Sequence, residues 1–262
     1  MVFKNLFLCA LVFVLSAAHV QARVDIIPQR LLMESRDRSA EITILNLYDE
    51  PSLYRISLLN YQQNIDGTYT TLDHPLSEVF DPEEVVRVSP KQFTVAAGGG
   101  RQKVRISLRK PSDLPEGEYR FHVLATRYKS QQGKGDSDDG VQINLVMNVG
   151  VAIPVVVRHG ELSVDAKISE ANLNVETGAP RLFVTVDRQG AASALGKLEV
   201  FWTPQGGEPE KVGRIKNMNV FTEIDSRTIA VPLNSLSSGP GSLRVVYVDD
   251  DGNVIDEKTL QL

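Results

Sequence analysis

Apolar and polar residues alternate with a period of two along most of the chain, which predicts short β-strands buried on one face only. In the first half the clearest alternating segments are 42–45, 53–58, 104–108 and 119–123. Turn sequences rich in Gly, Pro and Asp separate these segments, for example at 98–100 and 115–117. Many short strands divided by turns are typical of a β-sandwich or a barrel.

The same rhythm resumes after Arg158-His159-Gly160 and predicts a second domain. Its strands are expected at 162–164, 182–186, 198–202 and 228–231, with a closing hairpin of 243–248 and 254–262. Trp202, the single tryptophan, is expected in the core of this domain. We therefore expect an all-β protein with two immunoglobulin-like β-sandwich domains in tandem, residues 23–158 and 161–262.

The longest alternating segment, residues 141–157, is too long for one sandwich strand. Each of its odd positions is apolar, and most of its even positions are polar or small. At ~3.3 Å per residue it would extend about 56 Å, more than an immunoglobulin-sized sandwich can cover. Pro154 suits an edge strand, since proline cannot donate to a central ladder.

Two interpretations of this segment are open. In the first interpretation the apolar face stays inside the protein. The segment is then two strands joined by a kink at Gly150, or one strand that runs between the domains. Alternatively, its N-terminal part overhangs its own domain and offers apolar side chains to a partner. An exposed edge of this kind invites aggregation unless it is used for strand addition.

The N-terminus has the three parts of a secretory signal peptide, residues 1–22. Lys4 is followed by an apolar run at 6–15, and Val20-Gln21-Ala22 offers a cleavage site after Ala22. A membrane anchor is the alternative, but about ten apolar residues are too few to span ~30 Å of hydrocarbon. The single cysteine, Cys9, would leave with the signal peptide, so the mature chain is expected to be soluble and free of disulfides.

Charge and residue spacing argue against several other functions. Without Lys4 the chain has 27 basic and 33 acidic residues and no basic run, which disfavours nucleic acid and anionic lipid as partners. His74, His122 and His159 lie far apart, and no nucleophile stands in an elbow-like context. The run 249–253 lacks the ligand spacing of a calcium loop, so we interpret it as a hairpin turn with solvated carboxylates. We expect no enzyme activity, no cofactor and no metal.

Four segments of the first domain, in their order and spacing, resemble the PapD-like periplasmic chaperones of pilus and fimbrial subunits. They are 28–32, 90–106 with its glycine turn and Gln-x-Val-Arg strand, 114–123, and 153–158 ending on an arginine. The second domain matches only in size and strand content. The resemblance implies a periplasmic chaperone without a membrane anchor, which stabilises pilus subunits by donor-strand complementation and has an outer-membrane usher as a further partner.

The resemblance also implies which residues bind the subunit: Arg30, Ile143, Leu145, Met147, Val149 and Val151. The apolar ones would fill the groove of a subunit that lacks its final strand. Arg30 matches one of two basic residues that hold the subunit's terminal carboxylate in the interdomain cleft, although a surface arginine on an edge strand is the alternative. The second basic residue falls on Pro154, so either another base such as Arg127 replaces it or the clamp is weaker.

Two other classes of protein are compatible with a secreted sandwich fold. A structural or adhesive immunoglobulin-like subunit could take part in strand exchange without chaperone activity, but it would lack a complete first domain. An enzyme or ligand-binding protein on the same scaffold would need a convergent polar pocket, which the sequence does not display.

Overall fold

The structure, a computed structural model, describes residues 24–128, 148–175, 179–234, 236 and 239–262. The expected signal peptide and the candidate binding residues Ile143, Leu145 and Met147 lie outside the described residues. The described chain is almost entirely β, and its single helix is the short α1, Pro82–Val85. With four residues, α1 is far shorter than a helix that could span a membrane.

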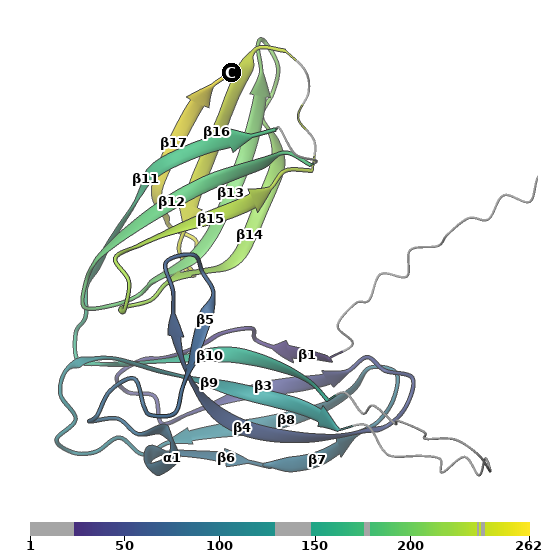
Figure 1. The fold of residues 1–262 in the computed structure, drawn as a ribbon, viewed down its shortest axis with the longest axis vertical. Coiled ribbons are helices and arrows are strands. Elements are labelled where there is room, and N and C mark those ends of the chain that lie inside the picture. Colours follow the sequence, from purple (N-terminus) through teal and green to yellow (C-terminus); the bar gives the residue numbers. More distant parts are fainter. Residues whose placement is uncertain (1–23, 129–147, 176–178, 235, 237–238) are drawn as a thin grey trace, which may run out of the picture.

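The first sandwich packs two sheets face to face (Figure 1). One sheet has the strand order β1 (Val24–Ile27), β3 (Ser39–Asn46), β8 (Gly100–Leu108) and β6 (Val86–Ser89). The other has the order β2 (Leu31–Met33), β10 (Val149–His159), β9 (Gly117–Tyr128), β4 (Ser52–Gln63) and β5 (Tyr69–Leu72), and β7 (Gln92–Val95) also pairs with β4. The predicted strands 42–45, 53–58, 104–108 and 119–123 fall within β3, β4, β8 and β9.

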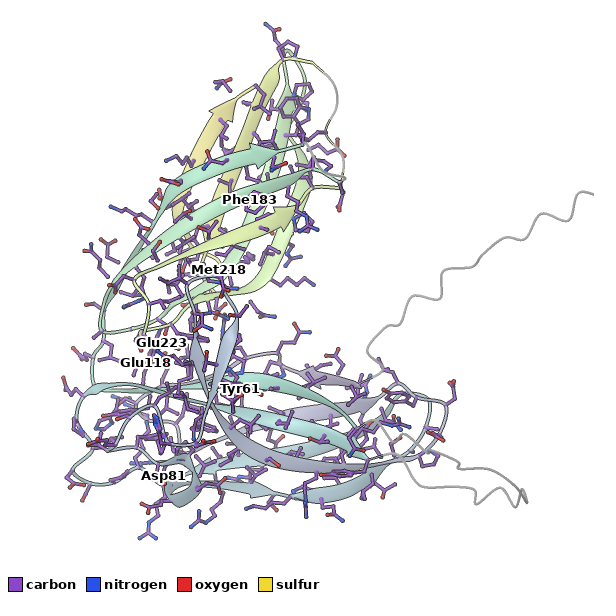
Figure 2. The ribbon with its side chains drawn as sticks, viewed as in Figure 1. Tyr61, Asp81, Glu118, Phe183, Met218 and Glu223 are labelled. Atoms are coloured by element: carbon purple, nitrogen blue, oxygen red, sulfur yellow. The ribbon has the colours of Figure 1, made fainter. Side chains whose placement is uncertain are left out.

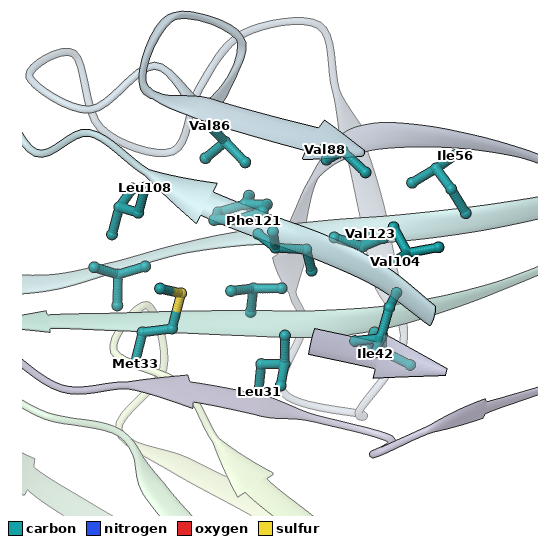
Figure 3. Packing of buried hydrophobic residues seen from close by; sticks show 14 of the residues in the cluster. Leu31, Met33, Ile42, Ile56, Val86, Val88, Val104, Leu108, Phe121 and Val123 are labelled. Atoms are coloured by element: carbon teal, nitrogen blue, oxygen red, sulfur yellow. The ribbon is translucent and has the colours of Figure 1, made fainter. Parts of the chain in front are cut away.

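The alternating apolar residues of these strands meet between the two sheets and form one core (Figure 3). Ile42 and Val104 come from the first sheet, and Ile56, Phe121 and Val123 come from the second. Each side chain of this size stabilises the fold by ~1.5–3 kcal/mol when fully buried. The period-two pattern therefore identifies the inward face of each strand correctly.

The second sandwich has a core of its own. Its smaller sheet has the order β11 (Val164–Asn174), β12 (Arg181–Gly190) and β15 (Ser226–Pro232). Its larger sheet has the order β14 (Glu210–Val220), β13 (Ala194–Pro204), β16 (Gly241–Val248) and β17 (Val254–Gln261). Trp202 is buried in this core, and β16 and β17 form the predicted closing hairpin.

The prediction of two immunoglobulin-like sandwiches in tandem is confirmed (Figure 1). β10, the last strand of the first sandwich, ends at His159. β11, the first strand of the second sandwich, begins at Val164. We propose that the domain boundary lies in the segment 160–163, in agreement with the division into 23–158 and 161–262.

One buried cation holds a loop of the second sandwich in place. The guanidinium of Arg188, on β12, has little exposed surface and donates hydrogen bonds to four backbone carbonyls. The acceptors are Gly190 O at 2.7 Å, Ile224 O at 3.1 Å, Ala192 O at 3.2 Å and Thr222 O at 3.3 Å. Arg188 thereby fixes the loop 221–225, which faces the first domain.

Candidate functional site: an open strand edge beside the domain junction

β10 is only partly covered by neighbouring strands. β9 pairs with its whole length, Val149 to His159, in antiparallel orientation. On the other side β2 pairs in parallel with Val155 to Val157 alone. Among the described residues no strand pairs with this side of β10 from Val149 to Pro154, so this stretch, which we call the open edge, presents free backbone groups. Pro154, with no N–H to donate, lies on this stretch.

The burial of the apolar face of β10 increases from Val149 to Val157. Val149 is 37% exposed, Val151 packs partly against the first core, and Ile153 is 2% exposed. The pairing register with β9 is unbroken through Gly150, so the interpretation of a kink there is wrong. The core of the first sandwich therefore covers the apolar face from Ile153 onward, covers Val151 in part and leaves Val149 partly exposed and outside the core.

Arg30 lies where the open edge ends. Leu31 pairs with Val155, so Arg30 directly precedes the point at which β2 begins to cover β10. Its side chain is 5% exposed and reaches the second domain, where Nη1 donates to Met218 O at 3.0 Å. Nη2 donates to both carboxylate oxygens of Asp250, at 2.6 and 2.5 Å. The alternative of an exposed surface arginine is therefore wrong, and the carboxylate that Arg30 binds belongs to its own chain.

This ion pair also corrects the interpretation of the turn 249–253. The turn connects β16 and β17 as expected, and Asp249 closes it by accepting from the backbone N–H of Asn253 at 2.7 Å. Asp250, however, is not simply a solvated carboxylate, because it binds Arg30 across the domain junction. A sequence shows three adjacent aspartates but not which of them meets a distant arginine.

Arg127 does not replace the missing second base. Because β9 and β10 are antiparallel, Arg127 lies opposite Val149, at the end of the strand pair farthest from the second domain. Its guanidinium binds Glu50 and the Ser52 hydroxyl, at 2.8 Å from Nε, and stacks 3.7 Å from the centroid of the Tyr48 ring. The interpretation that Arg127 takes the place of the second basic residue is therefore wrong, because Arg127 lies at the far end of the strand pair.

A buried carboxylate links the domains close to their connection. The side chain of Glu118 is 1% exposed and accepts hydrogen bonds from the backbone N–H of Ser193, at 2.9 Å, and from its hydroxyl. Arg158 donates from Nε to Glu118 at 3.2 Å and from Nη2 to Ser193 O at 3.2 Å. All three groups are thereby partnered within the junction.

A long hairpin of the first domain reaches the second domain. β4 continues beyond β9 and pairs with β5 alone at its far end (Figure 1). There Gln63, almost fully buried, donates from Nε2 to Asn219 Oδ1 at 2.5 Å and accepts from the Phe221 N–H at 3.0 Å. Its backbone N–H donates to Glu223 at 2.8 Å. The hairpin therefore fixes the loop that follows β14.

Arg120 completes this contact from β9. Its Nη2 donates to Glu223 and to Tyr61 O, and its guanidinium lies 4.0 Å from the centroid of the Phe221 ring. Figure 2 shows Glu118, Glu223 and Met218 at the junction between the two sandwiches, with Tyr61 on the hairpin. A small apolar cluster of Leu32, Val156, Leu195 and Phe221 joins the domains between these polar contacts.

His122 is a structural residue of the same face. Its ring contacts the edges of Tyr61 and Tyr69, with centroids 5.0 and 5.5 Å away. Burial, and secondarily the positive charge of Arg120, lowers the pKa of His122 to about 3. The ring is therefore neutral at physiological pH, which fits a packing role rather than acid–base chemistry.

The buried neutral His122 predicts a loss of stability in acid. Its pKa is about 3 in the folded protein and about 6.5 when unfolded, so below pH 6.5 only the unfolded chain takes up the proton. The contribution of neutral His122 to the free energy of unfolding is fully present above pH 6.5. It is lost as the pH falls toward 3, by up to ~1.4 kcal/mol per pH unit. In urea unfolding at pH 7, 6 and 5, His122→Phe should flatten this dependence, and the control His74→Gln, at an exposed site, should not. Equal slopes in all three proteins would contradict the assignment.

Metal-ligating side chains do not gather anywhere among the described residues. No three His, Cys, Asp or Glu side chains among them lie close enough to hold a metal ion. The described fold thus presents a two-domain β-sandwich protein with an open strand edge that ends at a buried arginine between the domains.

Comparisons with known proteins give weak structural similarities. No family model matches the sequence, and no curated protein sequence matches it. The YadV chaperone structure is similar with a TM-score of 0.44 at 13% identity, covering 92% of this chain and 100% of that one. The CsuC–CsuE chaperone–tip adhesion subunit complex of Acinetobacter baumannii has a TM-score of 0.43 at 12% identity, covering 92% and 98%.

A third structure, the Salmonella enterica SafA pilin in complex with the SafB chaperone, has a TM-score of 0.42 at 16% identity, covering 91% of this chain and 96% of that one. The second and third of these structures hold a chaperone together with a tip adhesion subunit and with a pilin, respectively. All three TM-scores lie below 0.5, so the proposed function rests on the geometry of this chain.

Proposed function

We propose that the protein is a non-enzymatic periplasmic chaperone that binds pilus or fimbrial subunits by strand addition to β10 before their assembly. The observation that carries this proposal is the open edge from Val149 to Pro154, where the apolar face emerges from the home core at Val149. A partner strand would satisfy the free backbone groups and bury the exposed side chain together. Ile143, Leu145 and Met147 would extend the same apolar face, although they lie outside the described residues.

The geometry of the sheet gives the incoming strand a preferred end point. A strand that paired with the open edge in parallel with β10 would lie in line with β2. It would run toward Leu31, the first residue of β2. Its C-terminal carboxylate would then arrive beside Arg30. With Arg127 excluded and Pro154 in the place of a second base, Arg30 is the proposed anchor for this carboxylate.

The alternative of an adhesive subunit that itself receives a strand is less well supported. A recipient needs a gap in its own sandwich, whereas the first core is closed by two sheets along the described strands. An outer-membrane usher as a second partner, and export by the predicted signal peptide, belong to the proposal.

The test is to produce candidate pilus subunits in a bacterial periplasm, alone and together with this protein. The proposal predicts that a subunit accumulates only in the presence of the protein and elutes with it as a complex of one copy each. Equal accumulation of every folded subunit in its absence would contradict a chaperone function.

Replacing Arg30 by alanine should weaken subunit capture at least tenfold. A charge-assisted hydrogen bond is worth ~1.5–3 kcal/mol, and the substitution also removes the only proposed anchor for the carboxylate. Each sandwich keeps its own core, so both domains should stay folded. The control is Arg36→Ala, at an exposed site in the turn between β2 and β3. Unchanged capture by Arg30→Ala in a titration with the purified subunit would refute the anchor.

A further inference from the structure

The proposed anchor is already occupied in the free protein. Both oxygens of Asp250 bind Nη2 of Arg30, and the backbone carbonyl of Met218 accepts from Nη1. The two partners differ in their surroundings, because the Arg30 side chain is 5% exposed whereas that of Asp250 is 49% exposed. The cation is fixed inside the junction, and the anion approaches it from the solvent side.

Asp250 can leave without dismantling its own turn. The turn is closed through Asp249, which accepts from Asn253 N at 2.7 Å and from Asn253 Nδ2 at 2.9 Å. Gly252 supplies the positive φ of 93° that the turn requires. The carboxylate of Asp250 is therefore a side-chain ligand on a turn that holds its shape by other bonds.

A cleft beside this ion pair is lined by Asp250, though not by Arg30, and gives the Asp250 carboxylate room to move away. It has a volume of about 170 Å³ and lies between the domains, with Leu32 and Arg158 on one side and Leu195, Tyr247 and the turn aspartates on the other. Three aspartates at its rim repel a second anion. Asp250 is thus attracted by Arg30 and repelled by its two neighbouring aspartates, and an incoming carboxylate would compete with it for the guanidinium.

We propose that Asp250 is an internal competitor, which holds Arg30 in the free protein and is displaced by the terminal carboxylate of a bound strand. This inference rests on the proposed function and adds a regulation to it. A site that is free in only a fraction of molecules binds its ligand with an affinity reduced by that fraction. Because Asp250 belongs to the second domain and Arg30 to the first, displacement also removes one contact between the domains.

The experiment uses two forms of one synthetic peptide and the full mature chain. The peptide alternates valine with threonine and lysine, is labelled at its N-terminus, and ends either in a free carboxylate or in an amide. Fluorescence anisotropy gives the affinity of each form for the wild type, for Asp250→Asn and Asp250→Ala, and for Asp251→Asn. The last variant removes the same charge from the next residue of the turn and is the matched control.

Both Asp250 variants should bind the carboxylate peptide about tenfold more tightly than the wild type does, which corresponds to ~90% self-occupation. Their affinity for the amide peptide should be unchanged, and Asp251→Asn should change either affinity by no more than about twofold. Thermal unfolding of each variant checks that the sandwiches remain intact.

Three results would overturn the competitor. If both peptides gain equally, the effect is general loosening of the junction. If the Asp250 variants bind neither peptide more tightly than the wild type does, while both peptides bind the wild type, strand addition stands and the competition fails. If no protein binds either peptide, the competitor and the proposed strand addition fail together.

Discussion

Replacing Val149 by glutamate is expected to reduce subunit capture at least about a hundredfold while leaving the melting temperature of the free protein nearly unchanged. The side chain is 37% exposed in the free protein and would be buried in a complex. Burial of an unpaired carboxylate there would cost more than the ~1.5–3 kcal/mol that the valine contributes. Met147→Glu should act in the same way, although Met147 lies outside the described residues. A titration with purified subunit measures the loss.

Two neighbouring substitutions test whether the effect follows the burial of β10. Asn148→Glu, at an exposed position next to Val149, should retain capture. Ile153→Glu should instead unfold the first sandwich, because Ile153 is 2% exposed in the home core. If Val149→Glu unfolded the free protein as well, Val149 would belong to the home core and the overhanging face would not exist.

Arg188→Met is expected to remove ~3–5 kcal/mol of the free energy of unfolding of the second sandwich. Methionine fills a similar volume but leaves the four carbonyl groups bound by Arg188 without their donors. A loss of this size should lower the melting temperature of the domain by at least about 10 °C.

The matched control for this prediction is Arg181→Met, at an exposed position near the start of the same strand. Calorimetry of the two variants and the wild type makes the comparison. A shift of less than about 2 °C for Arg188→Met would mean that water satisfies the loop carbonyls equally well.

The strands could be predicted because each inward face repeats every two residues. Ile42, Phe121 and Val123 are apolar between polar neighbours, and this local pattern alone places them in the core. The same pattern located β10 and the hairpin of β16 and β17. The extent of the open edge also depends on β2, and three residues are too few for a sequence pattern to reveal.

Apart from Arg30, which the resemblance places in the interdomain cleft, the members of the domain junction could not be predicted, because they look like ordinary surface residues. Gln63, Glu118 and Arg120 are polar, yet their side chains are buried and bonded to residues of the second domain. Val156 stands at an even position of the alternating segment, yet the second domain buries it against Leu195 and Phe221. These contacts join residues far apart in the sequence, which a local pattern cannot reveal.

Amide hydrogen exchange tests the central claim most directly, with the mature protein measured alone and in a purified complex with a pilus subunit. Strand addition at the open edge predicts that, between Val149 and Ile153, the amides that point away from β9 gain protection of at least about tenfold in the complex. β17, which forms an outer edge of the larger sheet in the second sandwich, serves as the internal reference and should exchange at the same rate in both samples. A stable complex that protects β17, or any surface other than β10, while the open edge exchanges as in the free protein would contradict the account.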